Sequence, residues 1–236
     1  MKLQRVPLIA YLCLLPILLA LGVWQLYRAE EKRVLISLKE QRQSTETLVL
    51  SATIPDKPEA LLYMPIQAKG HYDTNHQYLL DNQLNKGRAG YFVLTPFLLR
   101  NINKVVLVNR GWLPLGKSRD VLPDIGVYTG EITIRGRINH FPGVGLKLAG
   151  AEIPSEHWPS LVQVIDINIL TKQLNYPLFD FQIELDKEAP NGFAREWQTP
   201  PSMTPEKHVG YAVQWFLLAL TLTILFVKYG FNKSHD

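Results

Sequence analysis

Three ring-bearing side chains near the carboxyl end of the chain have types and spacing that could bind an iron cofactor. His208, Tyr211 and Trp215 follow one another at i, i+3 and i+7, so a helix would place them on one face. A neutral imidazole is a good ligand for iron, and the amino end of a helix disfavours protonation of a histidine. The pattern therefore makes His208 a candidate axial ligand of a haem iron.

Each of these residues also has a simpler interpretation. Tyr and Trp are common anchors at membrane surfaces, and a histidine at the entrance of a helix can simply be solvated. Gln214 lies off the stripe, and an uncharged polar residue there favours contact with a neighbouring helix or with lipid headgroups. The residue types alone leave both interpretations open for His208, Tyr211 and Trp215.

The segment that carries these residues predicts a transmembrane helix. Thr204 and Pro205 have the types expected of an N-cap and a first helical residue. Residues 209–227 contain no charged side chain, and about 20 apolar residues suffice to cross a bilayer as a helix. Residues 7–27 form a second apolar run. That run exceeds the core of about 7–15 residues in a signal peptide, which favours a retained anchor over a cleaved leader.

Basic residues flank the outer ends of both apolar runs. Lys2 and Arg5 precede the first run, and Lys228 and Lys233 follow the second. Short basic ends prefer the cytoplasm, so the prediction is a hairpin with both termini cytoplasmic and the intervening segment outside. A bacterial inner membrane with a periplasmic domain is favoured over a mitochondrial setting, because no Arg- and Ser-rich amphipathic segment precedes the first run.

The segment between the two runs predicts a polar helix, a linker and a β-rich domain. Residues 29–43 are rich in Glu, Lys, Arg and Gln, and Pro55 and Pro58 interrupt the chain after them. Turn-forming residues at 73–75 and 101–103 each separate two runs of strand-forming residues, which indicates two hairpins. We therefore expect a membrane α+β protein in which two transmembrane helices flank a β-rich, small antiparallel barrel-like extramembrane domain.

The predicted boundaries follow from these patterns. In chain order they are a cytoplasmic tail (1–6), a transmembrane helix (7–27), a polar helix and linker (28–58), the β-rich periplasmic domain (59–204), a second transmembrane helix (205–228) and a second cytoplasmic tail (229–236).

Composition argues against several classes of function. The net charge is only +4, and no run of Lys and Arg is interleaved with aromatic residues, so nucleic-acid binding is not expected. Cys13 is the only cysteine, which argues against a thiol oxidoreductase, and three methionines are too few for a Met-rich copper site. None of the common motifs of hydrolases, phosphate-binding loops or dinucleotide-binding folds is present, so an enzyme is not expected.

Two further clusters combine aromatic and basic residues. The first is GVWQLYR at the end of the first apolar run, where Trp24 and Arg28 lie at i and i+4 and could form a cation–π contact. The second is VNRGWLP, in which a predicted strand ends in a turn. Its central residues are Asn109, Arg110, Gly111 and Trp112. A structural corner is favoured there, with Gly111 for the backbone and Trp112 in the core, and a partner-binding turn is the alternative.

Together, these clusters resemble the Surfeit-locus (Surf-one/Shy) family of cytochrome c oxidase assembly factors. The resemblance rests on GxWQxxR in the first apolar run, VNRGWLP, the pair Trp158 and Pro159, and the HxGYAxQWF opening of the second run. It covers nearly the whole chain, and the order of helix, β-rich domain and helix is similar to the family's fold. Some members have Asn before the His of the last motif, where this chain has Lys207.

The resemblance implies a non-enzymatic role in the assembly of a haem–copper oxidase, by aiding the delivery or insertion of haem a. The implied partners are the catalytic subunit of that oxidase, haem a synthase and membrane lipid. In the family, the His of the last motif is the position implicated in haem ligation, and it corresponds to His208. From their positions we also expect Trp24 and Trp215 to flank the porphyrin, with Tyr211 on the same stripe. Arg28 is expected to pair with a propionate.

Two other functions remain as alternatives. One is a membrane-tethered interaction module that stabilises an oxidase assembly intermediate without binding a cofactor. The other is a copper-delivery protein, which the scarcity of Cys and Met disfavours. The colour of the purified protein would distinguish a haem carrier from an interaction module.

Overall fold

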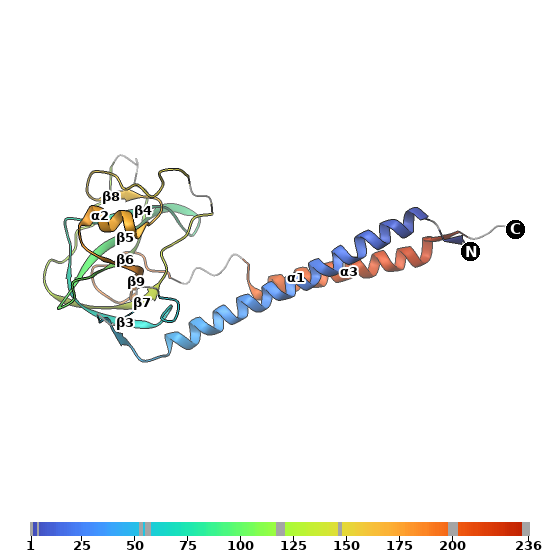
Figure 1. The fold of residues 1–236 in the computed structure, drawn as a ribbon, viewed down its shortest axis with the longest axis horizontal. Coiled ribbons are helices and arrows are strands. Elements are labelled where there is room, and N and C mark those ends of the chain that lie inside the picture. The colour runs from blue at the N-terminus through green and yellow to red at the C-terminus, as the bar shows by residue number, and fades with distance from the viewer. Residues whose placement is uncertain are drawn as a thin grey trace. The chain divides into compact units, whose positions relative to one another are not determined.

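The computed structural model describes residues 2–3, 5–51, 54, 58–116, 121–145, 148–197 and 203–232. The chain forms two compact units, one made of Met1–Glu40 with Thr199–Asp236 and the other of Gln41–Gln198. The first contains two long helices and the second contains the sheet (Figure 1). Two residues used in the sequence predictions, Pro55 and Lys233, lie outside the described residues.

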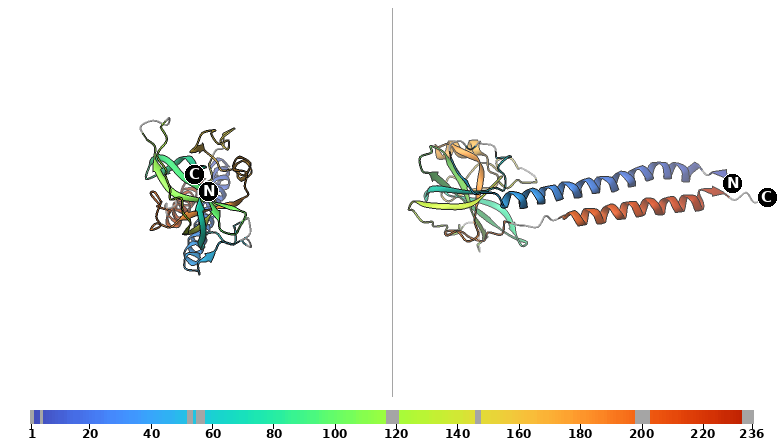
Figure 2. Two further views of the ribbon diagram at one scale, coloured as in Figure 1. Left: turned by 90° about the vertical axis from the view of Figure 1, so that its left-hand side faces the viewer. Right: turned by 90° about the horizontal axis from the view of Figure 1, so that it is seen from below.

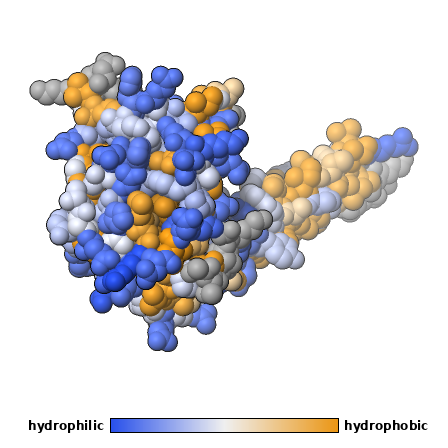
Figure 3. Space-filling view, turned by 60° about the vertical axis from the view of Figure 1, so that its left-hand side comes forward, coloured by the Kyte–Doolittle hydropathy of each residue, from blue (hydrophilic) through white to orange (hydrophobic). Residues whose placement is uncertain are grey.

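The helical unit consists of α1 (Arg5–Gln43) and α3 (Pro205–Tyr229). Both helices are long and apolar enough to cross a membrane, with mean hydropathies of 2.5 and 1.9 in their most apolar windows. They lie side by side and antiparallel (Figure 2), and their ends carry the short paired strands β1 (Lys2–Leu3) and β10 (Phe231–Asn232). Apolar side chains cover much of the helical surface that Figure 3 shows. Such a surface is stable in lipid rather than in water.

Small residues and aromatic rings bring the two helices together. The ring of Phe216 covers Gly22, where an added Cβ would lie 2.5 Å from the ring atom Cε1. Near the other end, Tyr11 stacks on Phe226 with ring centroids 4.3 Å apart, and its hydroxyl lies 3.3 Å from Oγ1 of Thr223. Close approach at small residues is the usual basis of helix association in a membrane, where burial of apolar surface gives little driving force.

The second unit is a closed five-stranded barrel with additional strands. The ring comprises β3 (Pro65–Tyr72), β7 (Ile132–Asn139), β9 (Leu178–Leu185), β6 (Val105–Pro114) and β5 (Arg88–Leu99), and the pairing of β3 with β5 closes it. The remaining strands lie outside this ring and are β2 (Leu48–Val49), β4 (Tyr78–Asn85) and β8 (Ser160–Val162). Two apolar helices at the ends of the chain therefore flank a β-barrel domain, which confirms the predicted fold class.

The barrel is mixed rather than purely antiparallel. Strand β9 is antiparallel to β7 and parallel to β6. Because β6 and β7 run in opposite directions, a strand inserted between them must be parallel to one of the two. The sequence pattern of β9 does not reveal this, since both kinds of pairing use the same apolar alternation.

One of the two predicted hairpins is wrong. Strands β3 and β4 follow each other around residues 73–75, but they do not pair with each other; both pair with β5. The turn is local, since Oδ1 of Asp73 accepts the backbone N–H groups of Asn75 and His76. The hairpin of β5 and β6 around residues 101–103 is confirmed.

The barrel interior is a single apolar cluster. All five strands of the ring contribute to it, and Phe97, Val108, Ile138 and Phe181 are fully buried within it. The short helix α2 (Ile167–Leu174) is capped by Asp166 and buries Leu170 in a neighbouring cluster. The domain therefore has its own core and can support buried polar side chains.

Candidate functional site

His208 lies in the first turn of α3, and its side chain is buried against α1. Its Nδ1 lies 2.7 Å from Oε1 of Gln25, and the two residues are only 6% and 9% exposed. An amide oxygen accepts but cannot donate a hydrogen bond, so Nδ1 carries the proton and donates it to Gln25. In the neutral imidazole, the free electron pair then resides on Nε2.

The local sequence explains why His208 is held at this point. Thr204 caps the helix, its Oγ1 accepting the backbone N–H of Lys207, and Pro205 occupies the first turn. The backbone N–H of His208 donates to the carbonyl of Thr204 at 3.2 Å. The imidazole is therefore anchored at the amino end of the helix.

Gln25 reaches His208 because it lies on the face of α1 that contacts α3. The other buried residues of α1 are Gly22 and Ala29, at i−3 and i+4 from Gln25. No role for Gln25 was predicted from the sequence, although this residue belongs to the motif of the first apolar run. A polar side chain between two small residues on one helix face was the available signal, since such faces form interhelical hydrogen bonds.

The other predicted cofactor residues do not share this buried position. Tyr211 and Trp24 are 44% and 52% exposed, and Trp215 is half-buried. The buried face of α3 passes through His208, Ala212 and Ala219. Adjacent helical residues are about 100° apart around the axis, which turns Tyr211 away from the face that Ala212 occupies and leaves its phenol toward the surroundings.

Arg28 is paired locally on the exposed side of α1. Its guanidinium lies 2.5 Å from the carboxylate of Glu31, and the two side chains are 43% and 62% exposed. Exposed ion pairs of this kind contribute about 0–1 kcal/mol. The guanidinium can therefore exchange this partner for another anion at little cost.

The donors present fit haem better than a bare metal ion. The described residues contain no group of three or more His, Cys, Asp or Glu side chains that could hold a metal. A single imidazole nitrogen suits an iron whose equatorial ligands come from a porphyrin. The hydrogen bond from Nδ1 to Gln25 is the kind of outer contact that orients such a ligand.

The motif VNRGWLP does not form the predicted turn, because all of it belongs to β6. Phe92 pairs with Trp112 but Leu94 pairs with Asn109, so β6 has one residue more than β5 over this stretch. The extra residue forms a β-bulge that Gly111 accommodates with φ of +115°. A Cβ at Gly111 would also lie 2.8 Å from the carbonyl oxygen of Ala194. The irregularity that the sequence indicated is therefore a bulge within a strand.

Arg110 is buried inside the domain, with 1% of its surface exposed. Its guanidinium donates to neutral acceptors on three other segments, namely Oε1 of Gln77 and the carbonyls of Ile125, Gly126 and Asn191, at 2.7–2.9 Å. Burial lowers the pKa of Arg110 to about 10, so it still carries its charge at neutral pH. These hydrogen bonds connect strand β6 to loops of the domain. The charge of Arg110 is therefore not exposed to a partner protein.

Asn109 and Trp112 are also held internally. Nδ2 of Asn109 donates to Oε1 of Gln182 at 3.0 Å, and Nε1 of Trp112 donates to the carbonyl of Gln83 at 2.9 Å. Their exposed fractions are 1% and 7%. All these contacts favour a structural role for the motif over a partner-binding one.

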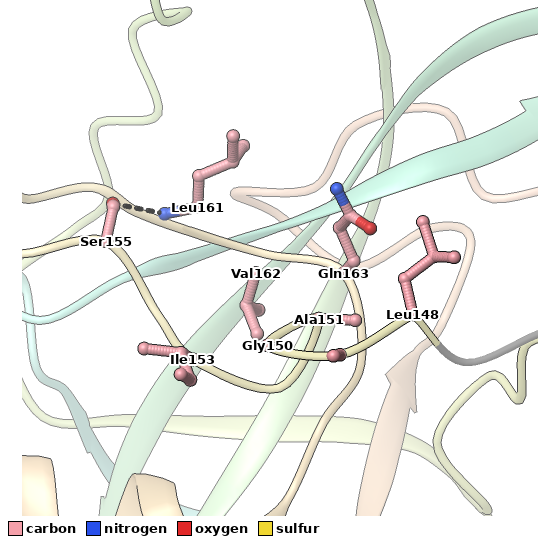
Figure 4. A pocket seen from close by; sticks show the side chains of 9 residues that line it. Leu148, Gly150, Ala151, Ile153, Ser155, Leu161, Val162 and Gln163 are labelled. Atoms are coloured by element: carbon pink, nitrogen blue, oxygen red, sulfur yellow. Dashed lines mark hydrogen bonds between the residues drawn. The ribbon is translucent and has the colours of Figure 1, made fainter.

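A cavity of about 330 Å³ lies between β8 and the loop before it (Figure 4). Its wall is mostly apolar, and the hydroxyl oxygen of Ser155 already accepts a hydrogen bond from the backbone N–H of Leu161 at 2.8 Å. Among the described residues, the lining of this cavity includes no charged or metal-binding side chain. Its chemistry therefore gives no reason to place a catalytic or haem-binding site there.

Comparison with known proteins shows similarity along nearly the whole chain. The model of the SURF1 family matches residues 12–220. A SURF1-like protein of Monosiga brevicollis is 26% identical over 235 residues, which cover 91% of this chain and 85% of that protein. A SURF1-like protein of Rickettsia felis is 27% identical over 240 residues, covering 98% of each. The cytochrome oxidase assembly protein SHY1 of Saccharomyces cerevisiae is 31% identical over 105 residues, or 44% of this chain and 26% of that protein.

Proposed function

Because the chain belongs to the SURF1 family, we propose that it acts as a non-enzymatic assembly factor for a cytochrome (haem–copper) oxidase. The related SHY1 of Saccharomyces cerevisiae is a cytochrome oxidase assembly protein, and this supports the assignment. The partner of such a factor is the catalytic subunit of the oxidase, with haem a synthase as the source of its cofactor. The two apolar helices, each long enough to cross a bilayer, support a location in the same membrane as these partners.

The proposed location is the inner membrane of a bacterium, with both termini cytoplasmic and the barrel domain periplasmic. Basic residues at the outer ends of both helices, including Arg5 and Lys228, support this orientation. A relative from the bacterium Rickettsia felis that matches over 98% of both chains supports the bacterial setting.

Within this role, we propose that His208 holds haem a before its transfer. The main support is the buried hydrogen bond between His208 and Gln25. Because this bond uses Nδ1, Nε2 remains as the electron-pair donor. Haem a, when bound, would supply an iron that accepts one nitrogen ligand from the protein. The chain supplies the donor atom, its orientation and an apolar setting that excludes water.

Four other residues have proposed supporting roles. The partly exposed rings of Trp24, Trp215 and Tyr211 offer apolar contact to a porphyrin from the lipid side. Arg28, whose pairing with Glu31 is exposed, offers a charged donor to a propionate. A single protein ligand with peripheral contacts binds more weakly than an enclosed site, which suits a carrier that must release its cargo.

The test is the absorption spectrum of the protein purified from cells that make haem a and from cells that do not. The proposal predicts a haem a spectrum in the first preparation and none in the second. A colourless protein that still restores oxidase assembly would overturn the carrier role. It would instead favour a membrane-tethered interaction module that binds no cofactor.

A further inference from the structure

We infer that Gln25 is a positioning residue that fixes the tautomer of His208. By accepting the Nδ1–H proton, it leaves Nε2 as the only ring nitrogen that can bind an iron. This inference rests on the proposed ligand role of His208. Its first consequence, the position of one proton, can nevertheless be measured in the absence of haem.

The packing of the two helices makes this hydrogen bond difficult to replace. Both side chains are buried, and their neighbours on the contact faces are the apolar residues Gly22, Ala29 and Ala212. A buried amide or imidazole that loses its partner is destabilised, because the apolar seam offers no water in compensation. Among the described residues, Gln25 is the hydrogen-bond partner of the imidazole of His208.

The chemical type of the partner also bears on how tightly a cargo is held. Many metal-binding histidines donate their second nitrogen to a carboxylate, which increases the basicity of the ligand. Gln25 presents a neutral amide oxygen instead, which orients the ring but withdraws the proton less strongly. The pair therefore combines a defined geometry with a modest donor strength, as a carrier that passes on its haem requires.

The arrangement also links the ligand to the packing of two different helices. Gln25 belongs to α1 and His208 to α3, and they are 183 positions apart in the sequence. A change in the distance between the helices would break the hydrogen bond and release the ring. The orientation of the ligand is thus a property of the assembled pair of helices.

The proton position can be tested by nitrogen NMR of the haem-free, full-length protein with labelled histidine in detergent micelles. The signal of His208 is identified by its loss in His208→Ala. The wild type should show a single tautomer of His208, with Nδ1 protonated and Nε2 unprotonated. In Gln25→Leu, the ring should no longer be held in this one tautomer. Gln25→Glu should restore it, because a carboxyl group offers an acceptor oxygen whether or not it is protonated.

Gln214→Leu is the matched control, since it makes the same change at an exposed glutamine of α3. It should leave the tautomer unchanged. Helix content and yield are measured for every variant. If Gln25→Leu does not accumulate, Gln25→Asn gives the same test, because its amide is one methylene too short to reach the ring.

Titration of the same proteins with haem a separates this inference from the proposed function. Gln25→Leu should weaken binding by about 10- to 100-fold, as loss of an outer contact does at other metal sites, and Gln25→Glu should recover it. If the wild type binds haem and Gln25→Leu has the same tautomer and the same affinity for haem, the positioning role is overturned. The carrier role would then remain intact. A shifted tautomer in Gln25→Leu without haem binding by any variant would overturn the carrier role alone.

Discussion

The ring of Phe216 on α3 occupies the space that a side chain at Gly22 of α1 would need. An added Cβ at Gly22 would lie 2.5 Å from Cε1 of that ring. Gly22 is three residues before Gln25 on the same buried face. The contact therefore sets the helix separation at the point where Gln25 reaches His208.

We predict that Gly22→Leu pushes the helices apart and reduces the haem content of the purified protein by about 10-fold or more, through loss of the Gln25–His208 hydrogen bond. The control is Gly210→Leu, because a Cβ at Gly210 meets no atom within 4 Å. Haem absorbance per protein, measured on both variants, checks the prediction. Equal haem content in the two variants would show that close packing at Gly22 is not required.

Arg110→Ala should destabilise the barrel domain before it affects the helices. The change removes the Arg110 donor from the carbonyls of Ile125, Gly126 and Asn191, and it removes a large buried side chain. We expect a loss of about 3 kcal/mol or more, because each buried acceptor left unsatisfied costs about 1–3 kcal/mol. Thermal unfolding of the full-length protein measures it, with Arg88→Ala at an exposed site as the control.

Trp112→Ala should act in the same way, because the indole fills the core and donates to Gln83. The expected loss of stability is about 3–5 kcal/mol, as for other large buried aromatic residues. Full stability of either variant combined with a complete loss of oxidase assembly would contradict the structural role of this motif and favour a partner-binding one.

The Asp73 carboxylate should make the stability of the barrel domain depend on pH in the acidic range. Burial acts to raise its pKa, but hydrogen bonds from His76, Tyr176 and the backbone of Asn75 outweigh burial and hold the pKa below the ordinary 3.8. A carboxyl whose pKa is lowered on folding contributes stability that is present above the unfolded pKa and is lost as pH falls through the folded pKa.

We therefore predict that part of the stability is lost below about pH 3.8 and that Asp73→Asn removes this component. Thermal unfolding of both proteins as a function of pH measures the effect. A wild type and a variant with the same dependence on pH would contradict it.

The proposed orientation predicts where fused reporter enzymes are active. A periplasmic phosphatase fused after Lys117 should be active, and one fused after Lys233 should be inactive, because the positive ends remain in the cytoplasm. The opposite pattern of activity would show that the chain is inverted in the membrane.

Features that depend on neighbouring residues in the sequence could be predicted. The absence of charge between residues 209 and 227 indicated the second apolar helix, and the types of Thr204 and Pro205 indicated its first turn. The local signal in VNRGWLP was also real, because Gly111 does adopt a positive φ. The sequence could not show whether this glycine ends a strand or bulges within one, because that depends on the pairing with β5.

Features that depend on distant partners could not be predicted. Strand β5 pairs with three different strands. The spacing of residues in the sequence does not indicate that β3 and β4 each pair with β5 and not with each other. The contact between Gln25 and His208 is of the same kind, since it requires two helices from opposite ends of the chain. The spacing of His208, Tyr211 and Trp215 indicated a helix, which α3 confirms, but it could not indicate the partner of the histidine.

The most direct test of haem ligation by His208 is the absorption spectrum of purified His208→Ala protein from cells that make haem a. One residue at the end of a long apolar helix adds little to the free energy of membrane insertion, so the amount of protein should be normal. Haem absorbance should be lost or strongly weakened in this variant. His208→Met should keep some binding with a shifted spectrum, because a thioether also ligates haem iron. A His208→Ala protein with unchanged haem content and an unchanged spectrum would contradict the proposed ligand role of His208.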